Sequence, residues 1–312
     1  MSFYEHLTQF AGLTVVDWNP NGGVVAAGYA LRLALSYNTA QAGTQWSDQF
    51  VTLLAHPDVA ALAGLVVGAW GEMFDQSAEA ARVVEALVAA RDRLPNLRAI
   101  FFGDVISEEC EISWIQNTDM SPLLSAYPQL EHFGVRGSNS LSFGALQHLN
   151  LRSLTVQSGG LPAGVVRAIA AAELPALEHL ELWLGTPNYD GDATVEDLAP
   201  ILAGDRFPRL RYLGLRNSEL ADEIAVALAN APVLEQLHVL DLSLGTLGDE
   251  GATALLASPA TARLEKLDLH HHYCSPAVVA QLAALPLSVD TSEPEAPDIY
   301  GGERHRYVAV SE

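Results

Sequence analysis

The sequence contains little cysteine. Cys110 and Cys274 are the only two among 312 residues, and they lie far apart in the chain. Secreted scaffolds that are held together by disulfides carry more cysteines, so this class of fold is excluded. We expect both side chains to be free thiols in a reducing compartment.

Basic residues are also scarce. The chain has 16 lysines and arginines against 38 aspartates and glutamates, a formal net charge of −22, and Lys266 is the only lysine. Such a field repels phosphate backbones and anionic lipid headgroups, so we expect neither a nucleic-acid partner nor a membrane partner. A partner protein with a basic segment is the better expectation, although an acidic surface also serves solubility alone.

Long hydrophobic runs are missing as well. The longest, at 59–70, has about 12 residues, whereas a membrane-spanning helix needs about 20. The first residues, from Met1 to His6, carry no basic segment and precede no long apolar run, unlike a signal peptide. These features together predict a cytoplasmic protein.

The sequence does contain a repeated pattern, apolar-x-x-apolar-x-apolar. Its clear copies begin at Leu97, Leu130, Leu151, Leu177, Leu210, Leu237 and Leu264. Successive copies start about 21 to 33 residues apart, close to the period of roughly 20 to 29 residues of leucine-rich repeats. A further copy at Leu62-x-x-Leu65-x-Val67 and apolar residues at 31–35 extend the pattern upstream.

The pattern predicts a strand in each copy. Side chains alternate along a strand, so the last two apolar positions of a copy point into the same core. One such strand cannot bury its own apolar face, and we therefore expect the copies to stack as a parallel sheet. Helix-start signals follow the strands, namely Ser275 with Pro276, Thr194 with Asp197 at capping-box spacing, and Asp249 as an N-cap.

The strand–helix units of roughly 27 residues resemble the ribonuclease-inhibitor type of leucine-rich repeat. More closely, the chain is similar over essentially its full length to an uncharacterised family of bacterial cytoplasmic leucine-rich-repeat proteins. Segments that carry this resemblance are GDVISEECEISWI (103–115), LELWLG (180–185) and YVAVSE (307–312). It implies an α/β leucine-rich-repeat solenoid, a curved horseshoe with parallel strands on the concave face and helices on the convex face. It brings no known activity.

The solenoid is expected to span residues 1–287, with residues 1–30 as an N-terminal cap and repeats from about residue 31. Acidic residues and prolines follow, so residues 288–312 are expected to form an acidic linker and a C-terminal tail. The end of the tail, 306–310, is predicted to be an extended segment that covers the end of the core.

Two stretches interrupt the repeats after strand ends, where function often lies. One, 104–119, is acidic, and the other, 186–192, is a loop rich in Pro, Asn, Asp and Gly. The acidic stretch would suit a divalent cation or a basic peptide. It lacks the spacing of a calcium-binding loop, so a solvated loop is the favoured interpretation.

The outward-facing strand positions form the predicted binding surface. Aromatic and arginine side chains, which dominate many protein interfaces, occur at these positions. The predicted partner-binding residues are His132, Arg136, His179, Glu181, Trp183, Tyr212, Arg216, Asp241 and Asp268. The alternative is that each is a solitary surface residue, with Trp183 covered by the loop that follows it.

No catalytic motif is convincing, so we expect no catalytic residue, no cofactor and no metal. The run HHHYC at 270–274 contains metal-ligand types, with His305 as a further candidate. Neighbouring residues in a strand point to opposite faces, however, and three consecutive histidines do not converge on one ion. Cys274 is expected inside the core.

The sequence therefore favours a non-enzymatic scaffold that binds a partner protein through the concave strand face and the strand-end loops. Two alternatives stay open. One is a regulatory or inhibitory subunit of a single cognate enzyme, which would use the same surface. The other is a metal-dependent hydrolase that uses His132, His179 and Glu181, a combination that also arises by chance on a mixed polar surface.

Overall fold

The strands follow the repeats along the chain. The structure, a computed structural model, describes all residues except 1–2, 22–27, 72 and 74–76. In this part of the chain the strands are β1 (Gln9–Phe10), β2 (Leu13–Asp17), β3 (Tyr29–Leu33), β4 (Gly64–Val67), β5 (Ala99–Phe102), β6 (His132–Arg136), β7 (Ser153–Gln157), β8 (His179–Gly185), β9 (Tyr212–Ser218), β10 (Val239–Asp241), β11 (Lys266–Asp268), β12 (Ser288–Asp290), β13 (Asp298–Tyr300) and β14 (Glu303–His305).

Helices connect most of these strands. They are α1 (Tyr37–Gln41), α2 (Trp46–Leu54), α3 (Ser77–Ala89), α4 (Ser121–Ala126), α5 (Ala163–Ala170), α6 (Val195–Leu202), α7 (Ala221–Ala229), α8 (Asp249–Ala257) and α9 (Pro276–Leu282). Among the described residues, no helix is both long enough and apolar enough to cross a bilayer.

The main sheet has the strand order β1 to β12, so sequence neighbours are also neighbours in space. The first pair, β1 and β2, is antiparallel, and the pairs from β2 to β6 and from β8 to β12 are parallel. Leu240 lies opposite Leu213 on one side and Leu267 on the other. Equivalent positions of the repeat therefore stack, which confirms the predicted α/β leucine-rich-repeat solenoid.

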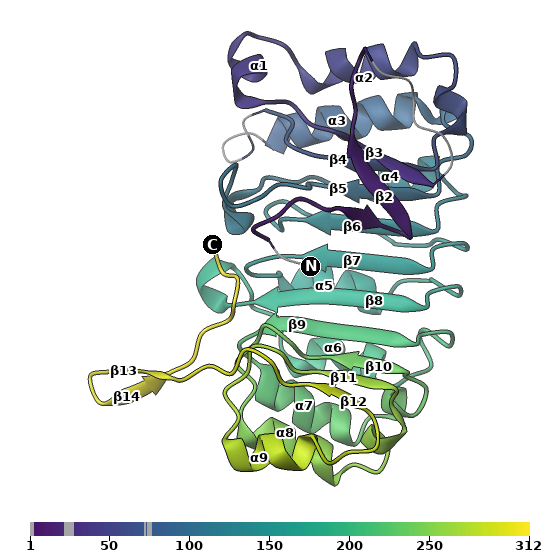
Figure 1. The fold of residues 1–312 in the computed structure, drawn as a ribbon. Helices are drawn as coiled ribbons and strands as arrows, with labels where there is room; N and C mark the ends of the chain where they lie inside the picture. Colours follow the sequence, from purple (N-terminus) through teal and green to yellow (C-terminus); the bar gives the residue numbers. More distant parts are fainter. Residues whose placement is uncertain (1–2, 22–27, 72, 74–76) are drawn as a thin grey trace. The chain divides into compact units, whose positions relative to one another are not determined.

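The contacts divide the chain into two compact units, residues 1–156 with residue 312, and residues 157–311. In each unit the helices lie on one side of the strands (Figure 1). The leucines of the motif point toward them and are fully buried, as at Leu240 and Leu267. The opposite side of the strands, called the helix-free face below, is the predicted binding surface.

Two of the predicted helix starts are confirmed. The Ser275 hydroxyl accepts the N–H of Val278, and Thr194 forms a capping box with Asp197. The prediction for Asp249 is wrong by one residue, because Gly248 is the N-cap of α8. The Asp249 carboxylate instead accepts the backbone N–H of Ser275, 2.6 Å away, at the start of the next repeat's helix.

In the first unit, the N-terminal segment covers the helix-free face. Leu7 and Phe10 form one buried cluster with side chains of β3, β4 and β5, among them Val66 and Phe101. The rings of Phe10 and Phe101 meet edge to face with their centroids 5.4 Å apart. This part of the predicted binding surface is therefore occupied by the chain itself.

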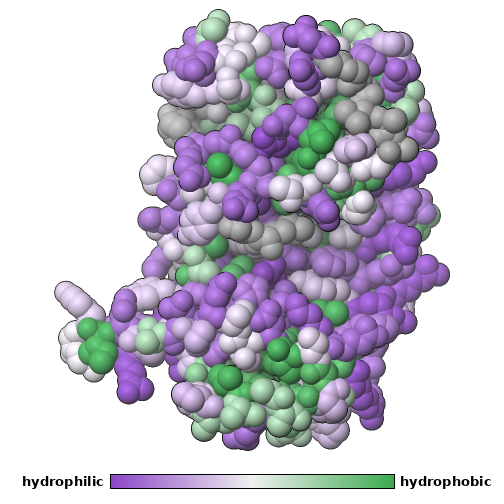
Figure 2. All heavy atoms as spheres, in the orientation of Figure 1, coloured by the Kyte–Doolittle hydropathy of each residue, from purple (hydrophilic) through white to green (hydrophobic). Residues whose placement is uncertain are grey.

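In the second unit, the sheet extends beyond the predicted end of the solenoid. Residues Ser288–Asp290, assigned by the sequence to a linker, form β12 and pair in parallel with β11. The hairpin of β13 and β14 then projects from this unit (Figure 1). Figure 2 shows hydrophobic atoms on the projection, and Ile299 and Tyr300 of β13 are strongly exposed there.

The stacked core predicts the effect of truncation. Leu240→Ala or Leu267→Ala should lower the free energy of unfolding by roughly 2 to 5 kcal/mol, because each removes a fully buried side chain and leaves a cavity. Urea denaturation measures the change, and Leu149→Ala, at a position that is 76% exposed, is the matched control. Equal stability of the core and control variants would contradict the register.

Candidate functional site

A row of polar side chains crosses the helix-free face of the second unit. The register places Glu181 of β8 opposite Gly214 of β9, then Asp241 of β10, Asp268 of β11 and Asp290 of β12. All are one residue after a core leucine or valine, so alternation turns them away from the helices. We call these positions the acidic row.

Arg216 is the central cation of this row. Its Nη1 lies 3.2 Å from Glu181 Oε1 and its Nε lies 3.2 Å from Asp241 Oδ2. Nε also donates to the Ser243 hydroxyl at 2.8 Å, and the guanidinium lies over the Trp183 ring, 5.4 Å from its centroid. The arginine thus bridges two carboxylates that would otherwise repel each other.

Tyr212 fills the gap that Gly214 leaves in the row. Its hydroxyl is 2.7 Å from Asp241 Oδ2 and 3.3 Å from Glu181 Oε2, and its ring stacks on His179 with 3.9 Å between centroids. A Cβ at Gly214 would come within 3.0 Å of the tyrosine ring, so glycine is what allows the bridge. Burial and the neighbouring carboxylates raise the pKa of Tyr212 well above its ordinary value, which keeps the hydroxyl protonated.

Glu181 is held as a carboxylate. Burial by itself would raise its pKa, but the hydrogen bond from His179 and the charge of Arg216 outweigh that effect and lower the pKa to about 2. The Trp183 indole N–H also donates to Glu181, at 2.8 Å. The buried charges of this network are paired and hydrogen-bonded, as burial requires.

The structure corrects the expected exposure of several predicted partner-binding residues. Trp183 is fully buried, and Glu181, Arg216, Asp241 and Asp268 are buried as well. His132, His179 and Tyr212 are half-buried. Strand alternation predicted the face correctly but gave no information on how closely its side chains pack. A role in partner binding stays a prediction for all of these residues.

Arg136 is also buried, and for a different reason. Its guanidinium lies over the rings of Phe3 and Phe101, at 5.6 and 5.7 Å, and donates to the carbonyl of Val105. Asp104, 3.9 Å away, accepts the backbone N–H of Leu7. Arg136 and Asp104 thus fasten the N-terminal segment onto the first unit.

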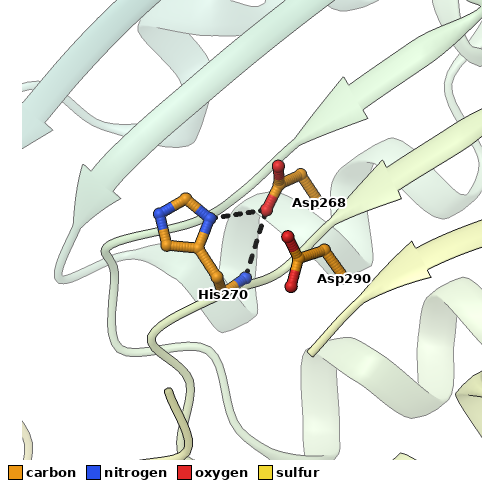
Figure 3. A group of neighbouring side chains, drawn as sticks. All are labelled: Asp268, His270 and Asp290. Carbon is orange, nitrogen blue, oxygen red and sulfur yellow. Dashed lines mark hydrogen bonds and ion pairs between the residues drawn. The ribbon is translucent and has the colours of Figure 1, made fainter. Parts of the chain in front are cut away.

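The three histidines point to different partners, as predicted, but the reason differs, because β11 ends at Asp268 and the run follows it as a loop in which His271 has a φ of 57°. His270 Nδ1 lies 2.6 Å from Asp268 Oδ1, whereas His271 lies near Glu295 and the carbonyl of Tyr307, and His272 is buried against the carbonyl of Thr291. The three imidazoles therefore do not share one site. The sequence missed Asp290, which the β11–β12 register brings beside Asp268 (Figure 3).

The cysteines lie in the interior. Cys274 is buried as predicted, and Cys110 is a second buried free thiol. Burial and nearby carboxylates raise the pKa of Cys110 to about 11 and that of Cys274 to about 12. Both thiols are therefore poor nucleophiles at neutral pH.

Two open hollows lie where the strands of the second unit end. An apolar hollow of about 640 Å³ is lined by Leu184, Pro187, Val195, Leu220, Val226 and Ala227, with Glu196 and Glu223 also in its lining. An acidic hollow of about 810 Å³ is lined by Glu219, Asp222, Glu223, Asp249 and Glu250, together with residues 304–307 of the C-terminal segment. The two share Glu219, Glu223 and Glu250, so they are adjoining parts of one surface.

The C-terminal segment already lies on this surface. Arg306 donates to Asp222 at 2.9 Å and to the carbonyl of Thr246 at 3.0 Å. Further along, Ala309 donates to the carbonyl of Leu244, and Val310 exchanges hydrogen bonds with the Asn217 amide. The predicted covering segment is therefore anchored at the ends of β9 and β10.

Comparison with known proteins finds similar solved structures. No protein-family model matches the sequence, and no curated protein matches it. A solved structure of a protein from Bacteroides fragilis is 32% identical, with a TM-score of 0.79, over 85% of this chain and 74% of that one. An internalin from Listeria monocytogenes is 17% identical with a TM-score of 0.42, over 86% and 61%, which is too low to support a functional comparison.

Removing Arg216 should destabilise the protein. Arg216→Met leaves Glu181 and Asp241 without their buried cation, and we expect a loss of about 3 to 5 kcal/mol in the free energy of unfolding. Arg167→Met, which breaks an exposed ion pair with Asp197, should cost about 1 kcal/mol or less. Urea denaturation of the two variants makes the comparison, and similar losses would contradict the bridging role of Arg216.

The low pKa of Glu181 predicts how stability depends on pH. Its folded-state pKa of about 2 lies below the ordinary value of 4.5, so its stabilisation is complete above about pH 4.5 and is lost as the pH falls toward about 2. Glu181→Gln lacks this contribution. The difference in free energy of unfolding between wild type and variant should therefore shrink between about pH 5 and about pH 3. A constant difference in urea titrations would show that Glu181 is not charged in the fold.

Proposed function

This chain belongs to the same family as the Bacteroides fragilis protein, and from its leucine-rich-repeat fold and the acidic hollow of its second unit we propose that it is a non-enzymatic scaffold for a partner protein. The partner contributes a basic, extended segment. It binds at the acidic hollow of the second unit and places an apolar side chain in the adjoining apolar hollow. The half-buried edge of the helix-free face, at His179 and Tyr212, is a further contact region.

The observation that carries this proposal is the chain's own C-terminal segment. It is extended, it places the Arg306 guanidinium on Asp222, and it uses main-chain hydrogen bonds at Leu244 and Asn217. Peptides are commonly recognised by an arginine that binds a carboxylate together with main-chain hydrogen bonds from neighbouring residues of the same segment. The surface thus has the groups that a basic peptide needs.

The negative charge of this surface also favours a basic peptide segment. Glu223 and Glu250 are exposed and line both hollows, and neither forms an ion pair within the described part of the chain, so their charge acts on the approaching partner. Exposed carboxylates of this kind steer a basic partner and raise its association rate. The first unit has less surface open to a partner, because Phe3, Leu7 and Phe10 cover its helix-free face.

The same surface would serve a regulatory or inhibitory subunit of one cognate enzyme, in which case the partner is that enzyme. We also place the protein in the cytoplasm, since buried free thiols at Cys110 and Cys274 are typical of a reducing compartment. Cell fractionation with an antibody against the protein tests this location, and recovery outside the cytoplasmic fraction would contradict it.

Charge reversal tests the proposed surface. Glu223→Lys combined with Glu250→Lys should weaken capture of the partner from source-cell extract by about tenfold or more, because it replaces attraction by repulsion. Quantitative mass spectrometry of affinity-purified material measures the loss. The matched control is Glu85→Lys with Asp92→Lys, which makes the same charge change at exposed positions of the first unit.

A synthetic peptide of known sequence tests the acidic hollow without a cell extract. A fluorescent peptide that alternates arginine with valine should bind wild type and the control variant, and its binding should fall as salt is raised. Loss of binding in the Glu223/Glu250 variant alone supports the proposal. Equal binding by all three proteins would move the site away from the acidic hollow.

A further inference from the structure

The far end of the acidic row carries a second kind of site. Asp268 ends β11, Asp290 ends β12, and the two are register partners on adjacent parallel strands. His270 follows two residues after Asp268, on the same side of the chain (Figure 3). One ligand atom from each of these three side chains lies within 4.8 Å of the other two. We call this group the Asp-His-Asp cluster.

Hydrogen bonds to residues two positions further along the chain hold the two carboxylates of the cluster in place. Asp268 Oδ1 accepts the backbone N–H of His270 as well as the bond to its imidazole, and the His270 carbonyl accepts the N–H of Leu244. Asp290 Oδ1 accepts both the N–H and the hydroxyl of Ser292. These bonds use Oδ1 of Asp290 and leave its Oδ2 available to coordinate an ion. In metal sites, outer-shell hydrogen bonds orient the ligating side chains in the same way.

The charges of the cluster are not balanced. Lys266 donates to Asp268 Oδ2 at 2.7 Å, but no ion pair joins Asp290 to a basic side chain among the residues that the structure describes. Like charges directly opposite each other on neighbouring strands are destabilising. One further positive charge between Asp268 and Asp290 would convert this repulsion into attraction.

The ligand set selects the class of cation. Two carboxylates and one imidazole suit first-row divalent metals such as Zn²⁺ and Mn²⁺, whereas Ca²⁺ and Mg²⁺ prefer oxygen ligands alone. Bonds of about 2.0 to 2.2 Å place such ligand atoms about 3 to 3.5 Å apart. His270 Nδ1 and Asp268 Oδ1, which are 2.6 Å apart, would therefore separate slightly to admit the ion, and all three ligand atoms already lie within 4.8 Å of one another. His270 and Asp290 are half-buried, so an ion has access from solvent.

We propose that Asp268, His270 and Asp290 bind one divalent first-row transition-metal ion. The ion takes the place of the proton between His270 Nδ1 and Asp268 Oδ1, and Asp290 Oδ2 completes a three-residue site. Three protein ligands leave at least one coordination position open to water or to a side chain of a bound partner. This site is separate from the acidic hollow and does not depend on the proposed function.

Calorimetric titration of tag-free, chelator-treated protein with ZnCl₂ and with MnCl₂ tests the site. We expect one saturable site per chain that persists in excess Mg²⁺ and in about 0.15 M salt, conditions that screen general binding to the acidic surface. His270→Ala and Asp290→Asn should each weaken Zn²⁺ binding by about 100-fold or more, since they remove a ligand. Circular dichroism without metal checks that both variants fold.

Two further variants separate this cluster from adventitious sites. His238→Ala removes an exposed histidine that pairs with Glu265 3.0 Å away, and it should leave the affinity unchanged. Lys266→Gln removes the cation that competes for Asp268, and it should strengthen binding several-fold.

Three results would overturn the proposal. They are the absence of saturable Zn²⁺ binding to wild type, equal affinity of wild type and His270→Ala, and loss of binding in His238→Ala instead. If Asp290→Asn does not fold, anomalous scattering from Zn²⁺-soaked wild-type crystals decides, because a peak must lie between the three named side chains.

Discussion

Parallel stacking in a fixed register is the constraint on which the rest of the structure depends. Each repeat position lies opposite the same position in the neighbouring strand, so Leu213, Leu240 and Leu267 stack directly on one another in the core. The same register stacks equivalent side chains on the opposite face, where neighbouring strands are about 4.8 Å apart. Asp241 and Asp268 are neighbours for that reason alone, and other side chains must then neutralise the row that the register creates.

The repeat period makes most of the fold predictable from the sequence. A period of apolar residues fixes which side chains share a core, and caps such as Ser275 fix where helices begin. The period does not say what covers the other face. Arg216 lies one strand away from Glu181 and Asp241, and Asp290 is the last residue of a short strand that the nearby prolines and acidic residues made look like a linker. Such contacts depend on packing between repeats, which no local pattern records.

The polar network also bears on the positions of the two proposed sites. In the middle of the acidic row the carboxylates are already bridged by Arg216 and Tyr212, so little binding capacity is left there. Breaking a buried ion pair of this kind is costly, because it leaves one buried charge without its partner. Within the described part of the second unit, unpaired charge lies at the margins, at Glu223 and Glu250 in the first turns of α7 and α8, and at Asp290. The proposed peptide and metal sites both lie at these margins because the centre is neutralised.

The N-terminal cover has a consequence for synthesis on the ribosome. Leu7 bonds to Asp104, 97 residues later in the chain, and Phe3 lies against Arg136, later still. The segment therefore leaves the ribosome long before the surface it covers exists, at a translation rate of about 5 to 20 residues per second. For several seconds its aromatic residues have no docking face, and during that time they are exposed to any chaperone that binds short apolar peptides.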